Sequence, residues 1–225
     1  MKRQLFFGAI GALASLSLAL PAAFAQQGDE PEYQPPSRGA PSGRIGGGTR
    51  APQRVPPVIA VSPDHTGQTI SAQPVLYYFM HTPAVIRLAL RPANEPGAAA
   101  LVDRILEAPP AAGIHRVALK TLGVTLTPGV EYRWTMSVPG EAREASATIL
   151  RVEPSATLSQ KLSASSGAKR YGLLAREGLW YDALDEVSRQ IDAAPKNAIP
   201  ARHRAALLEQ VGLIGVARFE RQRYE

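Results

Sequence analysis

The chain has 225 residues, a formal net charge of +6, 20 prolines, 19 glycines and no cysteine. The absence of cysteine excludes disulfide frameworks and thiol chemistry, so burial of apolar surface must hold any fold together. The length suffices for one β domain and a smaller helical unit, and the mild basic excess permits an anionic partner without requiring one.

The first 25 residues have the pattern of an export signal. Two basic residues precede the apolar run Leu5–Leu20, and Ala23-Phe24-Ala25 is a small-x-small cleavage site. We therefore expect cleavage between Ala25 and Gln26 and a periplasmic or secreted mature chain with net charge +4. The alternative is an uncleaved N-terminal anchor. No later segment is long and apolar enough to cross a membrane, so we expect no transmembrane segment after cleavage.

Residues 26–56 are rich in proline and glycine and poor in large apolar side chains, which predicts an extended or disordered leader. Arg38, Arg44 and Arg50 follow one another at six-residue intervals, and Arg54 comes soon after. A polyproline-type helix has about three residues per turn, so the first three would share one face. Such a face can bind carboxylates or phosphates, and these four arginines are candidate partner-binding residues. The alternative is a solvated linker.

Residues 57–153 contain short apolar runs separated by turn signals, which predicts an all-β sandwich of the immunoglobulin or fibronectin type. The clearest strand is Val130–Val138, in which apolar and polar residues alternate. The other expected strands are Val58–Val61, Pro74–Met80, Ala84–Leu90, Leu101–Leu106, Ile114–Leu119 and Ala147–Val152. Pro128-Gly129 followed by Tyr132 resembles a tyrosine corner, in which the hydroxyl bonds an upstream backbone group. A different antiparallel sheet with an ordinary strand tyrosine is the alternative.

Residues 154–225 have helical periodicity and predict a small helical unit. A first helix carries Leu158 and Leu162, and a second carries Tyr171 and Leu174 and ends at Gly178. The third helix places Trp180, Leu184, Val187 and Ile191 on one apolar stripe. A fourth helix begins near Pro200 and carries Leu207, Val211 and Ile214.

The segment Gly178–Leu184, closed by Pro195, is similar to one tetratricopeptide unit. A glycine permits the turn, an aromatic packs at the elbow, and the small Ala183 lets the helices approach. Trp180 lies on the apolar stripe and should be core. Tyr181 is off that stripe and is expected at the surface or at a domain interface, which makes it a further candidate partner-binding residue.

Catalytic, metal-binding and cofactor-binding residues are not expected. Asp64-His65 is the best acid–base pair in the chain, but an isolated pair lacks the third group that catalysis or metal binding needs. The preferred interpretation is a turn in which Asp64 caps a backbone amide.

Four segments together resemble the bacterial domain-of-unknown-function 928 family. They are Arg38–Arg50, Glu131–Trp134, Gly178–Leu184 and Leu207–Leu213. The resemblance implies export and a leader–sheet–helix layout, and it implies no reaction. Many relatives carry cysteines near the leader and near the Tyr-x-Trp strand, and a disulfide there cannot be transferred to this chain.

The sequence therefore predicts an exported, non-catalytic interaction or scaffold module whose partner is another envelope protein and not a nucleic acid. A binder of an anionic envelope polymer or lipid surface is the alternative. A hydrolase using Asp64 and His65 is a remote third hypothesis.

Overall fold

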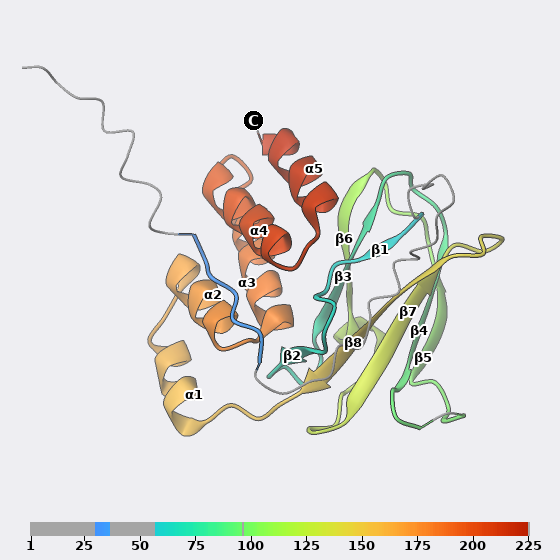
Figure 1. The fold of residues 1–225 in the computed structure, drawn as a ribbon, viewed down its shortest axis with the longest axis horizontal. Helices are drawn as coiled ribbons and strands as arrows, with labels where there is room; N and C mark the ends of the chain where they lie inside the picture. The colour runs from blue at the N-terminus through green and yellow to red at the C-terminus, as the bar shows by residue number, and fades with distance from the viewer. Residues whose placement is uncertain (1–29, 37–56, 96, 225) are drawn as a thin grey trace, which may run out of the picture.

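The computed structural model describes residues 30–36, 57–95 and 97–224. Two β-sheets lie to one side and five helices to the other in this part of the chain (Figure 1). The expected signal peptide and the four leader arginines lie outside the described residues.

Eight strands form two sheets that face each other as a sandwich-like layer (Figure 1). The first sheet has the order β1-β3-β6, and the second has the order β2-β8-β7-β4-β5. The strands are β1 (Ile59–Ala60), β2 (Gly67–Thr69), β3 (Val75–Met80), β4 (Ile86–Pro92), β5 (Val102–Leu106), β6 (Gly113–Ala118), β7 (Glu131–Ser137) and β8 (Glu144–Arg151). Seven of these correspond to the seven expected strands, and β2 is additional.

The alternation that predicts β7 reflects its burial. Every second side chain of β7 is buried and the others are half-buried, so one face of the strand packs into the sandwich. Ahead of β7, the backbone N–H of Thr127 donates to the hydroxyl of Tyr132 at 3.2 Å. This is the upstream backbone bond expected of the tyrosine.

Strand β2 pairs in parallel with β8, whereas all other pairings are antiparallel. Its sequence is Gly-Gln-Thr, which is too short to show the alternation of apolar and polar residues that predicts a strand. Gly67 is needed because a Cβ there would lie 2.7 Å from the ring of Tyr181. The strand therefore exists because a helix packs against it, which a local pattern cannot indicate.

The helices are α1 (Ala156–Ser163), α2 (Gly167–Arg176), α3 (Trp180–Ala193), α4 (Ala198–Gln210) and α5 (Ile214–Tyr224). The first three agree with the predicted helices. The prediction of a single fourth helix is wrong, because the chain turns at Gly212 (φ 74°) and Ile214 begins a separate helix. Glycine adopts this left-handed conformation without steric cost, and it ends helices for that reason.

Two helical hairpins, α2–α3 and α4–α5, repeat the same turn. Gly178 (φ 73°) and Gly212 (φ 74°) lie 34 residues apart. After each glycine, a buried leucine N–H donates to a leucine carbonyl five residues earlier, from Leu179 to Leu174 and from Leu213 to Leu208, at 2.9 Å in both cases. The expected single hairpin thus has a structural counterpart directly after it.

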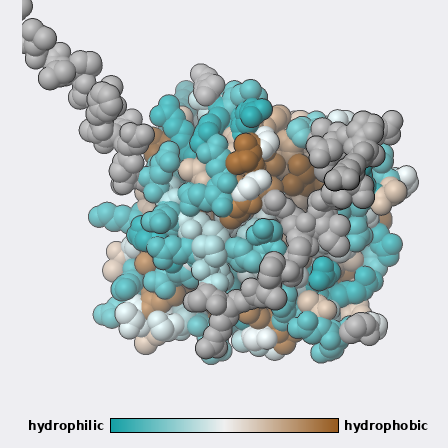
Figure 2. Space-filling model, in the orientation of Figure 1, coloured by the Kyte–Doolittle hydropathy of each residue, from teal (hydrophilic) through white to brown (hydrophobic). Residues whose placement is uncertain are grey.

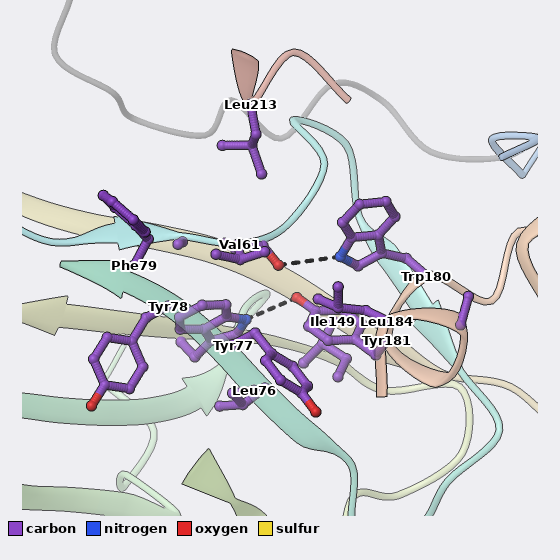
Figure 3. Close-up of a cluster of buried hydrophobic side chains, with 14 of the residues drawn as sticks. Val61, Leu76, Tyr77, Tyr78, Phe79, Ile149, Trp180, Tyr181, Leu184 and Leu213 are labelled. Carbon is purple, nitrogen blue, oxygen red and sulfur yellow. Dashed lines mark hydrogen bonds between the residues drawn. The ribbon is translucent and has the colours of Figure 1, made fainter. Parts of the chain in front are cut away.

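The helices and the sandwich share one buried core, formed where α3 packs on β2 and β3. Trp180 and Tyr181 are 0% and 1% exposed and point into it, as Figure 3 shows. The indole N–H of Trp180 donates to the carbonyl of Val61 at 3.2 Å. Helix α5 contacts β6, and the face in view is mostly hydrophilic except for a hydrophobic patch near that junction (Figure 2).

None of the helices in the described ranges combines the length and the apolarity that crossing a membrane requires.

Candidate segment-binding groove

Residues 30–36 lie extended against the helical unit, which is more than a hundred positions away in sequence. They run beside α2 and α3 in Figure 1. The backbone N–H of Gln34 donates to the carbonyl of Ala175, near the end of α2, at 3.1 Å. The same carbonyl also accepts from the backbone N–H of Gly178 at 3.0 Å, and a carbonyl oxygen has two lone pairs with which to accept both bonds.

Gln210, the last residue of α4, holds the same segment on both sides of Glu32. Its Oε1 accepts from the backbone N–H of Tyr33 at 2.7 Å. Its Nε2 donates to the carbonyl of Pro31 at 2.9 Å. A primary amide has one acceptor and one donor side, so a single glutamine satisfies a backbone N–H and a backbone carbonyl together.

The ring of Tyr33 fills a pocket between the sandwich and the helices and is 7% exposed. It stacks on the ring of His65 with centroids 5.8 Å apart and meets the edge of Trp180 at 5.2 Å. Its hydroxyl lies 2.9 Å from Nε2 of His65. Burial raises the pKa of Tyr33 above its ordinary value, so the hydroxyl stays protonated, and the tautomer of His65 decides which of the two groups donates.

Gly178, in the turn before α3, forms the wall next to the end of the segment. A Cβ at this position would lie 3.0 Å from the carbonyl oxygen of Gln34 and 3.2 Å from Cδ of Pro36. The glycine therefore serves both the left-handed turn and the close approach of the segment. We call the surface formed by Ala175, Gly178, Trp180, Gln210 and His65 the groove.

His65 forms part of this groove, and Asp64 lies beside its ring. Nδ1 of His65 lies 3.5 Å from Oδ1 of Asp64, whose side chain is 75% exposed. The other ring nitrogen of His65, Nε2, is hydrogen-bonded to the hydroxyl of Tyr33. Among the residues that the structure describes, no three His, Asp or Glu side chains are grouped in a way that would hold a metal ion.

Tyr181 was expected as a partner contact, and its burial corrects that assignment. At 1% exposure it offers no surface to a partner, because it lies between α3 and the sandwich. Of the two places expected for Tyr181, its burial excludes the surface, and Trp180 is fully buried as expected. Arg38, Arg44, Arg50 and Arg54 lie outside the described residues.

Asp182, in the first turn of α3, ties the helix to β2. Its Oδ2 accepts from the backbone N–H of Ile70 at 2.9 Å, and its Oδ1 accepts from the hydroxyl of Thr69 at 3.1 Å. Burial raises the pKa of this carboxyl to about 6, and the two hydrogen bonds oppose the rise only in part. The folded protein therefore binds a proton at a pH where the unfolded chain, with a pKa of 3.8, does not.

This difference makes stability depend on pH between about 4 and 6. As pH rises through this window, the unfolded chain loses its proton first and stability falls. From pH 7 to pH 5 we expect the wild type to gain about 1 kcal/mol relative to Asp182→Asn, which has no charge to lose. Urea unfolding of both proteins at the two pH values measures the gain. Identical pH dependence would contradict it.

A second hollow, of about 660 Å³, opens between β6 and α3. Four of its charged side chains form two ion pairs. Arg116 contacts Asp192 at 2.5 Å, and Arg189 contacts Asp185 at 3.1 Å. The bond to Asp192 is the main cause that raises the pKa of Arg116. The first pair joins β6 to α3 and the second lies within α3, so the groove remains the site with the better defined recognition geometry.

Sequence reasoning missed Tyr33 and Gln210. Tyr33 is the only aromatic residue between positions 26 and 56, which was a usable signal. The surrounding composition nevertheless indicates disorder, because burial by other parts of the chain is invisible to a local count. Gln210 looks like any polar residue at a helix end.

The chain was compared with known proteins and protein families. No curated protein matches the chain. The profile of the family described as Domain of Unknown Function (DUF928) matches residues 45–220, which is most of the chain and includes the sandwich and both hairpins. The chain therefore belongs to the DUF928 family.

Proposed function

We propose that the protein is an exported, non-catalytic interaction module. The observation that carries this proposal is the way Glu30–Pro36 is held, through main-chain hydrogen bonds and one buried aromatic ring. Proteins that recognise extended peptides use this combination, in which the main chain supplies affinity and pockets supply specificity. Export is proposed from the pattern of the first 25 residues.

We infer further that the scaffold combines an immunoglobulin-like sandwich with tetratricopeptide-like hairpins. The division into a β1-β3-β6 sheet and a β2-β8-β7-β4-β5 sheet, with the backbone bond to Tyr132, supports the first part. The 34-residue offset between Gly178 and Gly212 supports the second, because tetratricopeptide units have this length.

The arginines of the leader are proposed as additional partner contacts. Residues 37–56 connect Pro36, which is held against Gly178, to the start of the sandwich. Their four arginines are thus joined at both ends to the folded body.

Crosslinking in cells followed by mass spectrometry tests the proposal. Three tagged proteins are compared: the full chain, the chain lacking residues 26–54, and a chain in which Arg38, Arg44, Arg50 and Arg54 are glutamine. We expect one dominant envelope protein with the full chain and a loss of capture on deletion. Capture lost in the glutamine variant assigns the contact to the arginines.

Unchanged capture after the deletion would show that the leader has no part in binding. The absence of a captured protein in all three cases would contradict the interaction role and favour the anionic polymer or lipid surface. Binding of that kind should weaken steeply as salt increases.

A further inference from the structure

The contacts of Glu30–Pro36 are those of a peptide ligand that happens to be part of the same chain. Tyr33 and Gln210 are separated by 177 positions in sequence. The three backbone hydrogen bonds and the ring contacts do not depend on covalent continuity between segment and groove. A separate molecule with the same chemistry can therefore make all of them.

The burial pattern of residues 30–36 shows which of their side chains the groove recognises. Pro31 and Tyr33 are buried and Pro36 is half-buried, whereas Glu32, Gln34 and Pro35 are exposed. The Tyr33 hydroxyl is recognised by His65, and the Pro36 ring lies against Gly178. The recognised pattern is accordingly Pro-x-Tyr-x-x-Pro, in which each x denotes a position facing away from the groove.

We propose that the groove is a recognition site for extended Pro-x-Tyr-x-x-Pro segments. The chain's own Glu30–Pro36 is the resident ligand, and a matching segment of a partner protein displaces it. This rests on the proposed interaction role and names the ligand of that site. Because the connection through residues 37–56 keeps the resident segment near the groove at about millimolar effective concentration, only a strong or locally concentrated ligand displaces it.

Cleaving the connection tests this directly without altering the groove. A protease recognition sequence inserted between Gly46 and Gly47 of the full chain allows the resident segment to be cut free and washed away. The probe is a fluorescent peptide with the sequence of residues 28–38. We expect it to bind the cleaved protein at least about tenfold more tightly than the intact chain. A peptide with alanine for Tyr33 should lose at least about tenfold in affinity.

Two glycine variants provide a matched comparison in the cleaved protein. Gly178→Ala places a Cβ against the segment, whereas Gly123→Ala (φ 70°) has nothing within 4 Å of its added Cβ. Both carry the same left-handed backbone cost, so a difference between them reports the contact with the ligand. We expect Gly178→Ala to weaken peptide binding by about tenfold or more and Gly123→Ala to change it by less than about twofold.

Hydrogen exchange on the intact chain gives a second measurement in case cleavage unfolds the protein. Millimolar probe peptide should speed exchange at the Tyr33 and Gln34 amides, because it displaces them from Gln210 and Ala175. The alanine peptide should not. Equal effects of both peptides, together with equal affinities in the binding assay, would overturn the proposal.

The two proposals can fail separately. Specific peptide binding with no protein captured in cells leaves the groove assignment standing and removes the interaction role. If a partner is still captured by Gly178→Ala and no specific peptide binding is found, the interaction role stands and the groove assignment fails. A dimer that forms only after mixing at high concentration would identify a second copy of the chain as the displacing partner.

Discussion

Replacing Tyr181 by phenylalanine should lower the free energy of unfolding by about 2–4 kcal/mol, although it removes a single oxygen atom. The buried hydroxyl donates to the carbonyl of Thr148 at 3.1 Å and accepts from the indole N–H of Trp134 at 2.9 Å. The hydroxyl of Ser62 lies 3.0 Å away. Burial raises the pKa of Tyr181 to about 12, so the group remains a donor at neutral pH.

The large expected effect arises because each partner is buried with it. Leaving a buried donor or acceptor unsatisfied costs about 1–3 kcal/mol. Tyr78→Phe is the matched control, since its hydroxyl points away from this cluster in Figure 3, and we expect less than about 1 kcal/mol there. Urea unfolding monitored by circular dichroism measures both. Equal effects in the two variants would show that the Tyr181 network adds no stability.

Replacing Trp180 by alanine should cost about 3–5 kcal/mol. The side chain is completely buried, and its removal leaves a cavity between the helical unit and the sandwich. It also removes the edge contact with Tyr33 and the hydrogen bond to Val61. The groove therefore loses a wall at the same time as the core loses volume.

Two readouts separate these roles. Thermal or urea unfolding reports the cavity, and hydrogen exchange at the Tyr33 amide reports the groove. Trp180→Phe keeps most of the ring volume and should cost less than half as much as the alanine variant. A loss below about 1 kcal/mol for alanine would mean that Trp180 is not part of the core.

Sequence periodicity was a good guide wherever burial follows the local chain. The alternation in β7 and the stripe from Trp180 to Ile191 reflect one packed face each, so they predicted the strand and the helix. The fourth helix was wrong at Gly212, since the apolar spacing of Leu207, Val211 and Ile214 continues across a turn that only the glycine indicates.

Contacts between distant segments were not predictable in the same way. Tyr181 lies off the apolar stripe of α3 and is buried nevertheless, because the sandwich packs on that side of the helix. Tyr33 is buried by His65 and by Trp180, which lies more than a hundred positions away. A period of two or 3.6 residues describes one face of one element, and the groove is made by elements that meet only in the folded chain.

The bond between Tyr33 and Gln210 also sets the order in which the molecule can be completed. Besides His65 and Trp180, residues 30–36 find their partners on α2, on the turn before α3 and at the end of α4. These contacts span nearly the whole chain, and contacts of long sequence separation form late and slowly. During synthesis, the segment that carries Tyr33 is made long before Gln210, so its docking must wait for the helical unit.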